Sequence, residues 1–219
     1  MNDSNSSFNS EDTIAAISTP SGRGGIGIVR LSGPAARSIA EPLLKLRHPL
    51  APAQARFAEI LDSTGEVLDE AVVTYFQSPH SYTSEDIVEI SAHGSPVLLH
   101  HLLRQCLDAG ARLAEPGEFT QRAFLSGRLD LTQAEAVHDL IESTTLHQAR
   151  IAAQQLGGSL SRHITPIKQQ LISLIAALEA GIDFAEDDID LLAQDQISSQ
   201  IAAIEAPSPY CRPPLPTAA

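Results

Sequence analysis

Cysteine and tryptophan are nearly missing from this 219-residue chain, which contains two cysteines and no tryptophan. Cys106 falls in a stretch with helical periodicity, and Cys211 falls in a proline-rich segment. The chain has no C-x-x-C pair and no framework of paired cysteines. The sequence therefore predicts neither a disulfide-stabilised fold nor a structural zinc site.

Basic side chains are also scarce. Fourteen lysines and arginines stand against 27 aspartates and glutamates, which gives a formal net charge of −13. A field of this sign repels a phosphate backbone, so the chain is not expected to wrap nucleic acid by its general charge. Any contact with RNA must be local or be supplied by a partner protein.

Long apolar runs are absent as well. The segment LISLIAALEA at 171–180 contains Glu179 and is shorter than the roughly 20 residues that cross a bilayer. The first residues, MNDSNSSFNSED, lack the basic and apolar parts of a signal peptide. We therefore expect a cytoplasmic protein with no membrane span and with a disordered polar leader over residues 1–11.

Several motifs of catalysis and metal or nucleotide binding are missing. The chain contains no H-E-x-x-H, no G-x-S-x-G and no G-x-x-x-x-G-K-[ST] phosphate-binding loop. The acidic run DFAEDDID at 183–190 lacks the residue order of a calcium-binding loop. We interpret this run as the solvated start of a helix.

The first half of the chain alternates strand and helix patterns. Alternating apolar residues and β-branched residues predict strands, and apolar stripes opened by serine or proline predict helices. Ser95 is expected to cap one of these helices. The expected strands are 13–19, 26–33, 56–61, 70–77 and 85–92, and the expected helices are 33–46 and 95–110. This order predicts an α+β domain.

The second half has helical periodicity almost throughout. Thr132 and Glu135 have the spacing of a capping box at the start of a helix. Pro166 lies inside a later helical pattern and is expected to end or kink that helix. Further helical patterns cover 145–180 and 191–205.

The stretch STPSGRGGIGIVRLSG, residues 18–33, contains glycines in the G-x-G-x-x-G pattern of dinucleotide-binding loops. Such a loop requires a helix after its last glycine. Here Gly27 is followed by IVRLSG, which is rich in β-formers, so we reject this interpretation. Either Gly22, Gly24 and Gly27 form positive-φ turns between two strands, or their backbone closely approaches a ligand.

Two charged residues interrupt strands that otherwise resemble core. Arg30 lies between Val29 and Leu31, and alternation places it on the opposite face from both. It is either a solvated residue or a forked cation directed toward a carboxylate or phosphate. Glu89 in DIVEIS either lies on a wet face or has a partner, because an unpaired buried charge costs several kcal/mol. A planar ligand with an amino group beside a ring N–H, such as a pterin or guanine, would satisfy it.

Two further polar residues lie at predicted turns. Arg128 in LSGRLDLTQAE follows Gly127 between two predicted helices, and it is either a surface residue or part of a binding site. His93 in SAHGSP lies at a predicted strand-to-helix turn. A capping side chain and a catalytic base are both possible there, and the cap is favoured.

Four segments resemble, in order and spacing, the N-terminal part of the MnmE (TrmE) family of tRNA modification GTPases. They are DTIAAISTPSGRGGIGIVRLSG, SYTSEDIVEISAHGSP, EPGEFTQRAFLSGRLDLTQAEAVHDLI and GIDFAEDDID, and the resemblance covers roughly residues 12–206. It implies an α+β N-terminal domain, similar to the T-protein-like tetrahydrofolate-binding domains of one-carbon enzymes, followed by an incomplete all-α helical domain.

The resemblance also implies a ligand, 5-formyltetrahydrofolate. The family's folate-contacting arginine falls on Arg30, its glutamate on Glu89, and its third basic residue, often a lysine in relatives, on Arg128. Glu89 would accept from the pterin's donors, and the two arginines would contact the formyl or glutamate-tail oxygens. The resemblance assigns no catalytic residue and no metal ligand to this chain.

The partners implied by the resemblance are a second copy of the chain, a flavin-containing protein and tRNA. The homodimer would form through the N-terminal domain, and the flavoprotein would be of the MnmG (GidA) type. Together they would install a 5-carboxymethylaminomethyl-type group at the wobble uridine, with tRNA contacted only indirectly by this chain. GTP, Mg²⁺ and K⁺ would serve an inserted G domain of the full-length family.

The chain departs from the family pattern after IAAIEA, where relatives continue into the G domain and this sequence continues with PSPYCRPPLPTAA. We therefore expect a truncated or frame-shifted product that neither binds nor hydrolyses GTP. Apolar helical residues would be left partly uncovered, namely Leu171, Leu174, Ile175 and Leu178. The predicted regions are a disordered leader (1–11), a folate-binding and dimerisation domain (12–117), a partial helical domain (118–206) and a proline-rich tail (207–219).

Two other functions stay open at this point. The chain could be an autonomous folate-dependent one-carbon transferase that uses the same pocket without a G domain. Alternatively, it could be a non-catalytic interaction module whose helices bind a partner.

Overall fold

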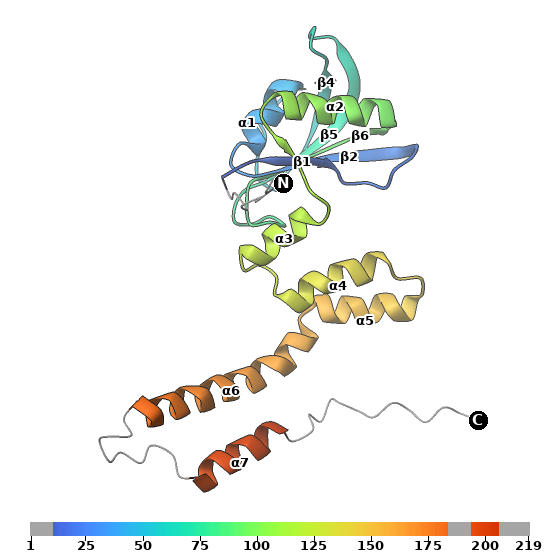
Figure 1. Ribbon diagram of the computed structural model, residues 1–219. Coiled ribbons are helices and arrows are strands. Elements are labelled where there is room, and N and C mark those ends of the chain that lie inside the picture. Colours follow the sequence, from blue (N-terminus) through green and yellow to red (C-terminus); the bar gives the residue numbers. More distant parts are fainter. Residues whose placement is uncertain (1–10, 184–193, 206–219) are drawn as a thin grey trace, which may run out of the picture. The chain divides into compact units, whose positions relative to one another are not determined.

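The computed structural model describes residues 11–183 and 194–205 (Figure 1). The predicted leader up to residue 10, the acidic run beyond Asp183 and the proline-rich tail lie outside these ranges. The chain divides into two compact units, Met1–His138 and Asp139–Ala219. Within the described ranges, no helix combines the length and apolarity that a membrane crossing requires.

A seven-stranded sheet with the order β3-β4-β5-β6-β2-β1-β7 forms the centre of the first unit. β1 and β7 are parallel, and every other neighbouring pair is antiparallel. The strands are β1 (Ile14–Ile17), β2 (Gly24–Ser32), β3 (Leu44–Leu46), β4 (Ala55–Leu61), β5 (Val67–Phe76), β6 (Ile87–Gly94) and β7 (Arg112–Leu113). The predicted α+β fold of this unit is confirmed.

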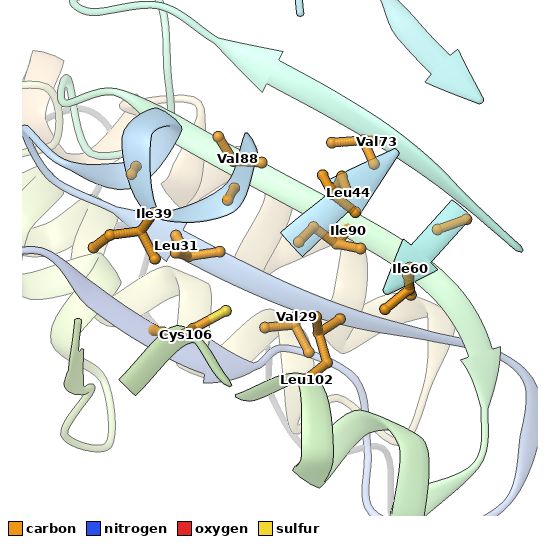
Figure 2. Packing of buried hydrophobic residues seen from close by; sticks show 14 of the residues in the cluster. Val29, Leu31, Ile39, Leu44, Ile60, Val73, Val88, Ile90, Leu102 and Cys106 are labelled. Atoms are coloured by element: carbon orange, nitrogen blue, oxygen red, sulfur yellow. The ribbon is translucent and has the colours of Figure 1, made fainter. Parts of the chain in front are cut away.

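The hydrophobic core lies between one face of this sheet and two helices, α1 (Ala36–Ala40) and α2 (Pro96–Asp108) (Figure 1). Alternate strand residues point into it because successive side chains leave a strand on opposite faces. Figure 2 shows this packing, which includes Val29, Leu31, Val73, Val88, Ile90, Leu102 and Cys106. The side of the sheet away from α1 and α2 is called the second face below, and α3 (Glu118–Leu125) lies on that side.

The segment predicted as one helix over 33–46 has three parts. α1 ends at Ala40, a 3₁₀ turn η1 covers Glu41–Leu43, and Leu44–Leu46 is β3. Pro42 lacks the N–H that continues a helix, and β4 supplies a pairing partner, with Leu44 opposite Ile60. The prediction was therefore wrong after Ala40, because sheet pairing overrides the apolar spacing of LLKL.

Both predicted helix caps in this unit differ from the structure. Ser95 occupies the N-cap position of α2, but its side chain makes no capping hydrogen bond. α4 (Leu131–Ile141) begins with a capping box at Asp130 and Gln133, not at Thr132 and Glu135. The backbone N–H of Gln133 donates to Asp130 Oδ1 at 2.9 Å, and that of Asp130 donates to Gln133 Oε1 at 3.0 Å.

The second unit is helical, as predicted, and contains α5 (Leu146–Leu156), α6 (Ser159–Asp183) and α7 (Gln194–Glu205). Pro166 was expected to end or kink this helix; α6 continues through Pro166, so the helix does not end there. The expected exposure of apolar residues holds for Leu171, Ile175 and Leu178 but not for Leu174, which is buried.

Candidate ligand site on the second face of the sheet

Arg30 and Glu89 face each other on the second face of the sheet. The antiparallel register of β2 and β6 places them directly opposite each other. The Arg30 Nε–H donates to Glu89 Oε1 at 2.8 Å, and Arg30 Nη2 lies 2.7 Å from the same oxygen. The two side chains are 26% and 23% exposed, so the pair is partly desolvated and still accessible. Within the protein, Arg30 supplies the opposite charge that compensates the Glu89 carboxylate.

This ion pair leaves hydrogen-bonding capacity on both residues. Both contacts from Arg30 go to Oε1 of Glu89. Among the described residues, Oε2 of Glu89 and Nη1 of Arg30 have no protein partner. A carboxylate acceptor and a guanidinium donor therefore lie side by side with capacity for a ligand.

Two aromatic rings flank the Arg30 guanidinium. Its Cζ lies 5.9 Å from the ring centroid of Tyr82 and 5.4 Å from that of Phe119 on α3, within the cation–π range of about 6 Å. The Tyr82 hydroxyl is hydrogen-bonded to the Thr120 hydroxyl at 2.9 Å. Sequence reasoning missed both rings, although aromatics make up only 4% of the chain and these two fall within SYTSED and EPGEFTQR.

α3 is attached to the first unit through a buried cluster of charges around Arg122. The Arg122 side chain is 1% exposed and contacts the carboxylates of Asp12, Glu85 and Glu118. Its Nη1–H donates to Glu85 Oε1 at 3.0 Å and to the backbone carbonyl of Asp12 at 3.0 Å. Arg112 contacts two of the same carboxylates, those of Asp12 and Glu118. The buried cation is therefore fully compensated, as burial of a charge requires.

Two carboxylates of this Arg122 cluster, those of Glu118 and Asp12, stay ionised at neutral pH. Burial alone would raise the pKa of Glu118, but hydrogen bonds from Arg112, the Glu115 backbone and Arg122 lower it to about 2. Burial would also raise the pKa of Asp12, but hydrogen bonds from Arg112 and Arg122 lower it. Glu118 and Asp12 thus contribute fixed negative charges to the cluster.

Arg128 lies outside this contact network. It follows α3 at a turn where Gly127 has a φ of +76°, and its backbone N–H donates to the carbonyl of Ala123 at 3.0 Å. Its side chain is exposed, and no described contact joins it to Arg30 or Glu89. The structure thus brings two of the three predicted site residues into contact.

His93 belongs to β6 and does not cap α2, so the favoured capping role was wrong. Its Nδ1 lies 2.7 Å from Asp69 Oδ1, and its backbone N–H donates to Asp69 Oδ2 at 3.0 Å. Burial would raise the pKa of Asp69, but these His93 bonds and a backbone bond from Glu70 lower it. Within the described part of the chain, no group of histidine, cysteine and acidic residues could hold a metal ion.

The glycines of the 18–33 stretch have different roles. Gly22 has a φ of +131° and makes a turn before β2, as expected. Gly24 and Gly27 belong to β2 itself, so the turn interpretation was wrong for these two. The strand that follows confirms that the stretch is not a dinucleotide-binding loop.

Comparison with known proteins matches nearly the whole described chain. Residues 13–128 match the family model "GTP-binding protein TrmE N-terminus", and residues 131–208 match "MnmE helical domain". The chain is 60% identical over 204 residues to tRNA modification GTPase MnmE of Koribacter versatilis and 48% identical over 190 residues to that of Aquifex aeolicus. These alignments cover 91% and 87% of this chain but 45% and 42% of the relatives. The chain thus spans less than half the length of the curated relatives it matches.

Proposed function

Because the chain belongs to the MnmE family of tRNA modification GTPases, we propose that its first unit binds 5-formyltetrahydrofolate at the Arg30–Glu89 pair. The observation that supports this proposal is the pair itself, which keeps an acceptor on Glu89 and a donor on Arg30 available on the second face. In the whole enzyme, the bound folate would either supply the one-carbon unit for modification of the wobble uridine or be an analogue of the folate that supplies it.

The donor and acceptor set of the pair fits this ligand. A pterin presents an amino group and a neighbouring ring N–H, which a carboxylate such as that of Glu89 accepts through charge-assisted hydrogen bonds. Formyl and carboxylate oxygens of the ligand are acceptors that suit the remaining N–H groups of Arg30. Tyr82 and Phe119 supply aromatic faces beside the guanidinium, as a planar ring system favours.

We assign Arg128 to the glutamate tail of the ligand. Arg128 follows Gly127 at the turn after α3, and its side chain is exposed. Because the side chain has no partner among the described residues, its guanidinium is available to a carboxylate. A contact with the tail requires less enclosure than a contact with the pterin, because the tail's carboxylates stay close to solvent.

GTP hydrolysis is not proposed for this chain by itself. Its sequence contains no G-x-x-x-x-G-K-[ST] loop to hold the β- and γ-phosphates. We propose that GTP turnover with Mg²⁺ and K⁺ requires parts of the family's longer proteins that this chain does not match. The reaction of a flavin-containing MnmG-type partner on tRNA would require those parts as well.

We propose that the chain forms a homodimer through its first unit. The second face carries apolar residues that a monomer leaves exposed, with Ile26 at 69%, Phe57 at 45% and Val72 at 47% exposed. They line a shallow hollow of about 560 Å³. Sedimentation analysis tests the proposal: Phe57→Glu should shift the chain to monomer. The control is Val97→Glu on α2, where Val97 is 82% exposed, and this variant should stay dimeric. If Phe57→Glu is still dimeric, this surface is not the dimer interface.

Calorimetric titration with 5-formyltetrahydrofolate tests the binding proposal. The chain should bind the ligand, and Glu89→Ala should abolish the heat of binding. A matched control is Glu59→Ala, which breaks another cross-strand ion pair of the same sheet, between Lys45 and Glu59 at 2.7 Å. Unchanged affinity in Glu89→Ala, or equal losses in both variants, would reject the site.

A further inference from the structure

We propose that Arg122 is a positioning residue for the Arg30–Glu89 site: its ionic cluster holds α3 against the sheet, so that Phe119 stays on the Arg30 guanidinium. The inference deepens the proposed folate site and rests on it for the ligand-binding part. It assigns a role to Arg122, the largest fully buried side chain among the residues that the structure describes.

The buried face of α3 holds the helix by charge. Of its eight residues, only Glu118, Arg122 and Ala123 are buried, and Phe119 is half-buried, so the apolar contribution of α3 is small. Phe124 and Leu125 are 39% and 51% exposed. A helix of this length has little stability of its own. Its position on the sheet therefore depends on ion pairs, those that Arg122 makes and the one between Glu118 and Arg112 of β7.

The same cluster also holds the loop that carries Tyr82. Glu85, a partner of Arg122, accepts a hydrogen bond from the Ser32 hydroxyl at 2.6 Å. Ser32 lies two residues beyond Arg30 on β2, and its hydroxyl is hydrogen-bonded to the Thr83 hydroxyl at 2.7 Å. One cluster thus fixes both segments whose rings flank Arg30, the loop with Tyr82 and the helix with Phe119.

Buried ion pairs are better suited to fixing a position than to adding stability. Desolvation offsets most of the attraction between the charges, whereas removal of one partner leaves the others buried and unpaired. Without Arg122, Glu118 keeps its contact with Arg112, whereas Glu85 loses its described ion pair and α3 loses its ionic link to the Tyr82 loop. We therefore expect α3 to shift on the sheet and to take Phe119 away from Arg30.

A double-mutant cycle in ligand affinity tests whether Arg122 acts through Phe119. We expect Arg122→Met to weaken 5-formyltetrahydrofolate binding about tenfold in the parent chain and less than about twofold in a Phe119→Ala background. Arg37→Met is the control, because it breaks an ion pair at 2.8 Å between Arg37 of α1 and Glu41 of η1 and should leave affinity unchanged. If the loss of affinity in the double variant equals the product of the losses in the two single variants, the proposal is overturned.

A second measurement needs no ligand and uses the absence of tryptophan. Phe119→Trp places a single reporter beside Arg30, and its emission should shift to the red when Arg122→Met is added, with the far-ultraviolet circular dichroism kept. Emission that does not shift would also overturn the proposal. If emission shifts but the parent chain binds no folate, the positioning role holds and the folate proposal fails.

Arg122→Lys provides for the case in which Arg122→Met does not fold. Lysine keeps the charge but cannot donate from a rigid fork to several carboxylates. It should give a smaller red shift of the reporter and a smaller loss of affinity, again suppressed by Phe119→Ala. A lysine variant with parental emission and parental affinity would show that the fork of Arg122 has no positioning role.

Discussion

Gly27 of β2 lies under Leu99 of α2, so closely that a Cβ added at residue 27 would stand 2.3 Å from Leu99 Cδ1. The last glycine of the apparent nucleotide-binding pattern therefore allows close contact between a strand and the helix that covers the core. The close approach is to a leucine side chain. Leu99 belongs to the same core as Val29 and Leu31, the two neighbours of Arg30 on β2.

Gly27→Ala should destabilise the protein by about 1–3 kcal/mol, because Leu99 and α2 must move to admit the methyl group. The measurement is the urea dependence of the circular dichroism of the parent and the variant. Gly25→Ala is the control: no atom lies within 4 Å of its added Cβ. Equal denaturation midpoints for the two variants would show that the Gly27–Leu99 contact is dispensable.

Glu118→Gln should remove an acid-sensitive part of the stability. The folded-state pKa of Glu118 is about 2, against an ordinary value of 4.5. Its ionised form thus stabilises the fold fully above about pH 4.5, and this stabilisation is lost as the pH falls toward 2. Near neutral pH, the free energy of unfolding of the parent should exceed that of Glu118→Gln by on the order of 3 kcal/mol. Denaturation series across the acid range should show the gap closing, and a gap independent of pH would contradict the lowered pKa.

Cys106 should be inert in the folded protein. Burial raises the pKa of its thiol to about 12, and the side chain packs in the core beneath α2. In a Cys211→Ser background, an aromatic disulfide reagent at mildly alkaline pH should label Cys106 only as the protein unfolds. Rapid stoichiometric labelling without denaturant would place this thiol at the surface.

Residue alternation was sufficient to predict the face that Arg30 occupies, but it could not predict the partner of Arg30. Val29 and Leu31 are core residues, so the side chain between them must point to the second face. Its pairing with Glu89 depends on the register between two strands, and the two residues are 59 positions apart. β2 and β6 are not consecutive in the chain, so the alternation within either strand does not show which residues of the two strands are paired.

The Arg122 cluster could not be predicted for a related reason. Asp12 and Glu85 are 110 and 37 positions from Arg122, and each occurs among polar residues typical of a surface. Only the fold brings them around one guanidinium. The short strand β3 is a similar case, because Leu44–Leu46 is extended only where β4 offers a partner.

The Nε–H of Arg30 offers the most direct test that the Arg30–Glu89 pair is the ligand site, since it donates to Glu89 Oε1 at 2.8 Å. In ¹⁵N-labelled protein titrated with 5-formyltetrahydrofolate, its resonance should shift to a new saturated position. The resonance of the Arg37 Nε–H on α1, which donates to Glu41 Oε1 of η1 at 2.8 Å, should stay in place. An Arg30 resonance that does not move while other resonances saturate would contradict the assignment of the site.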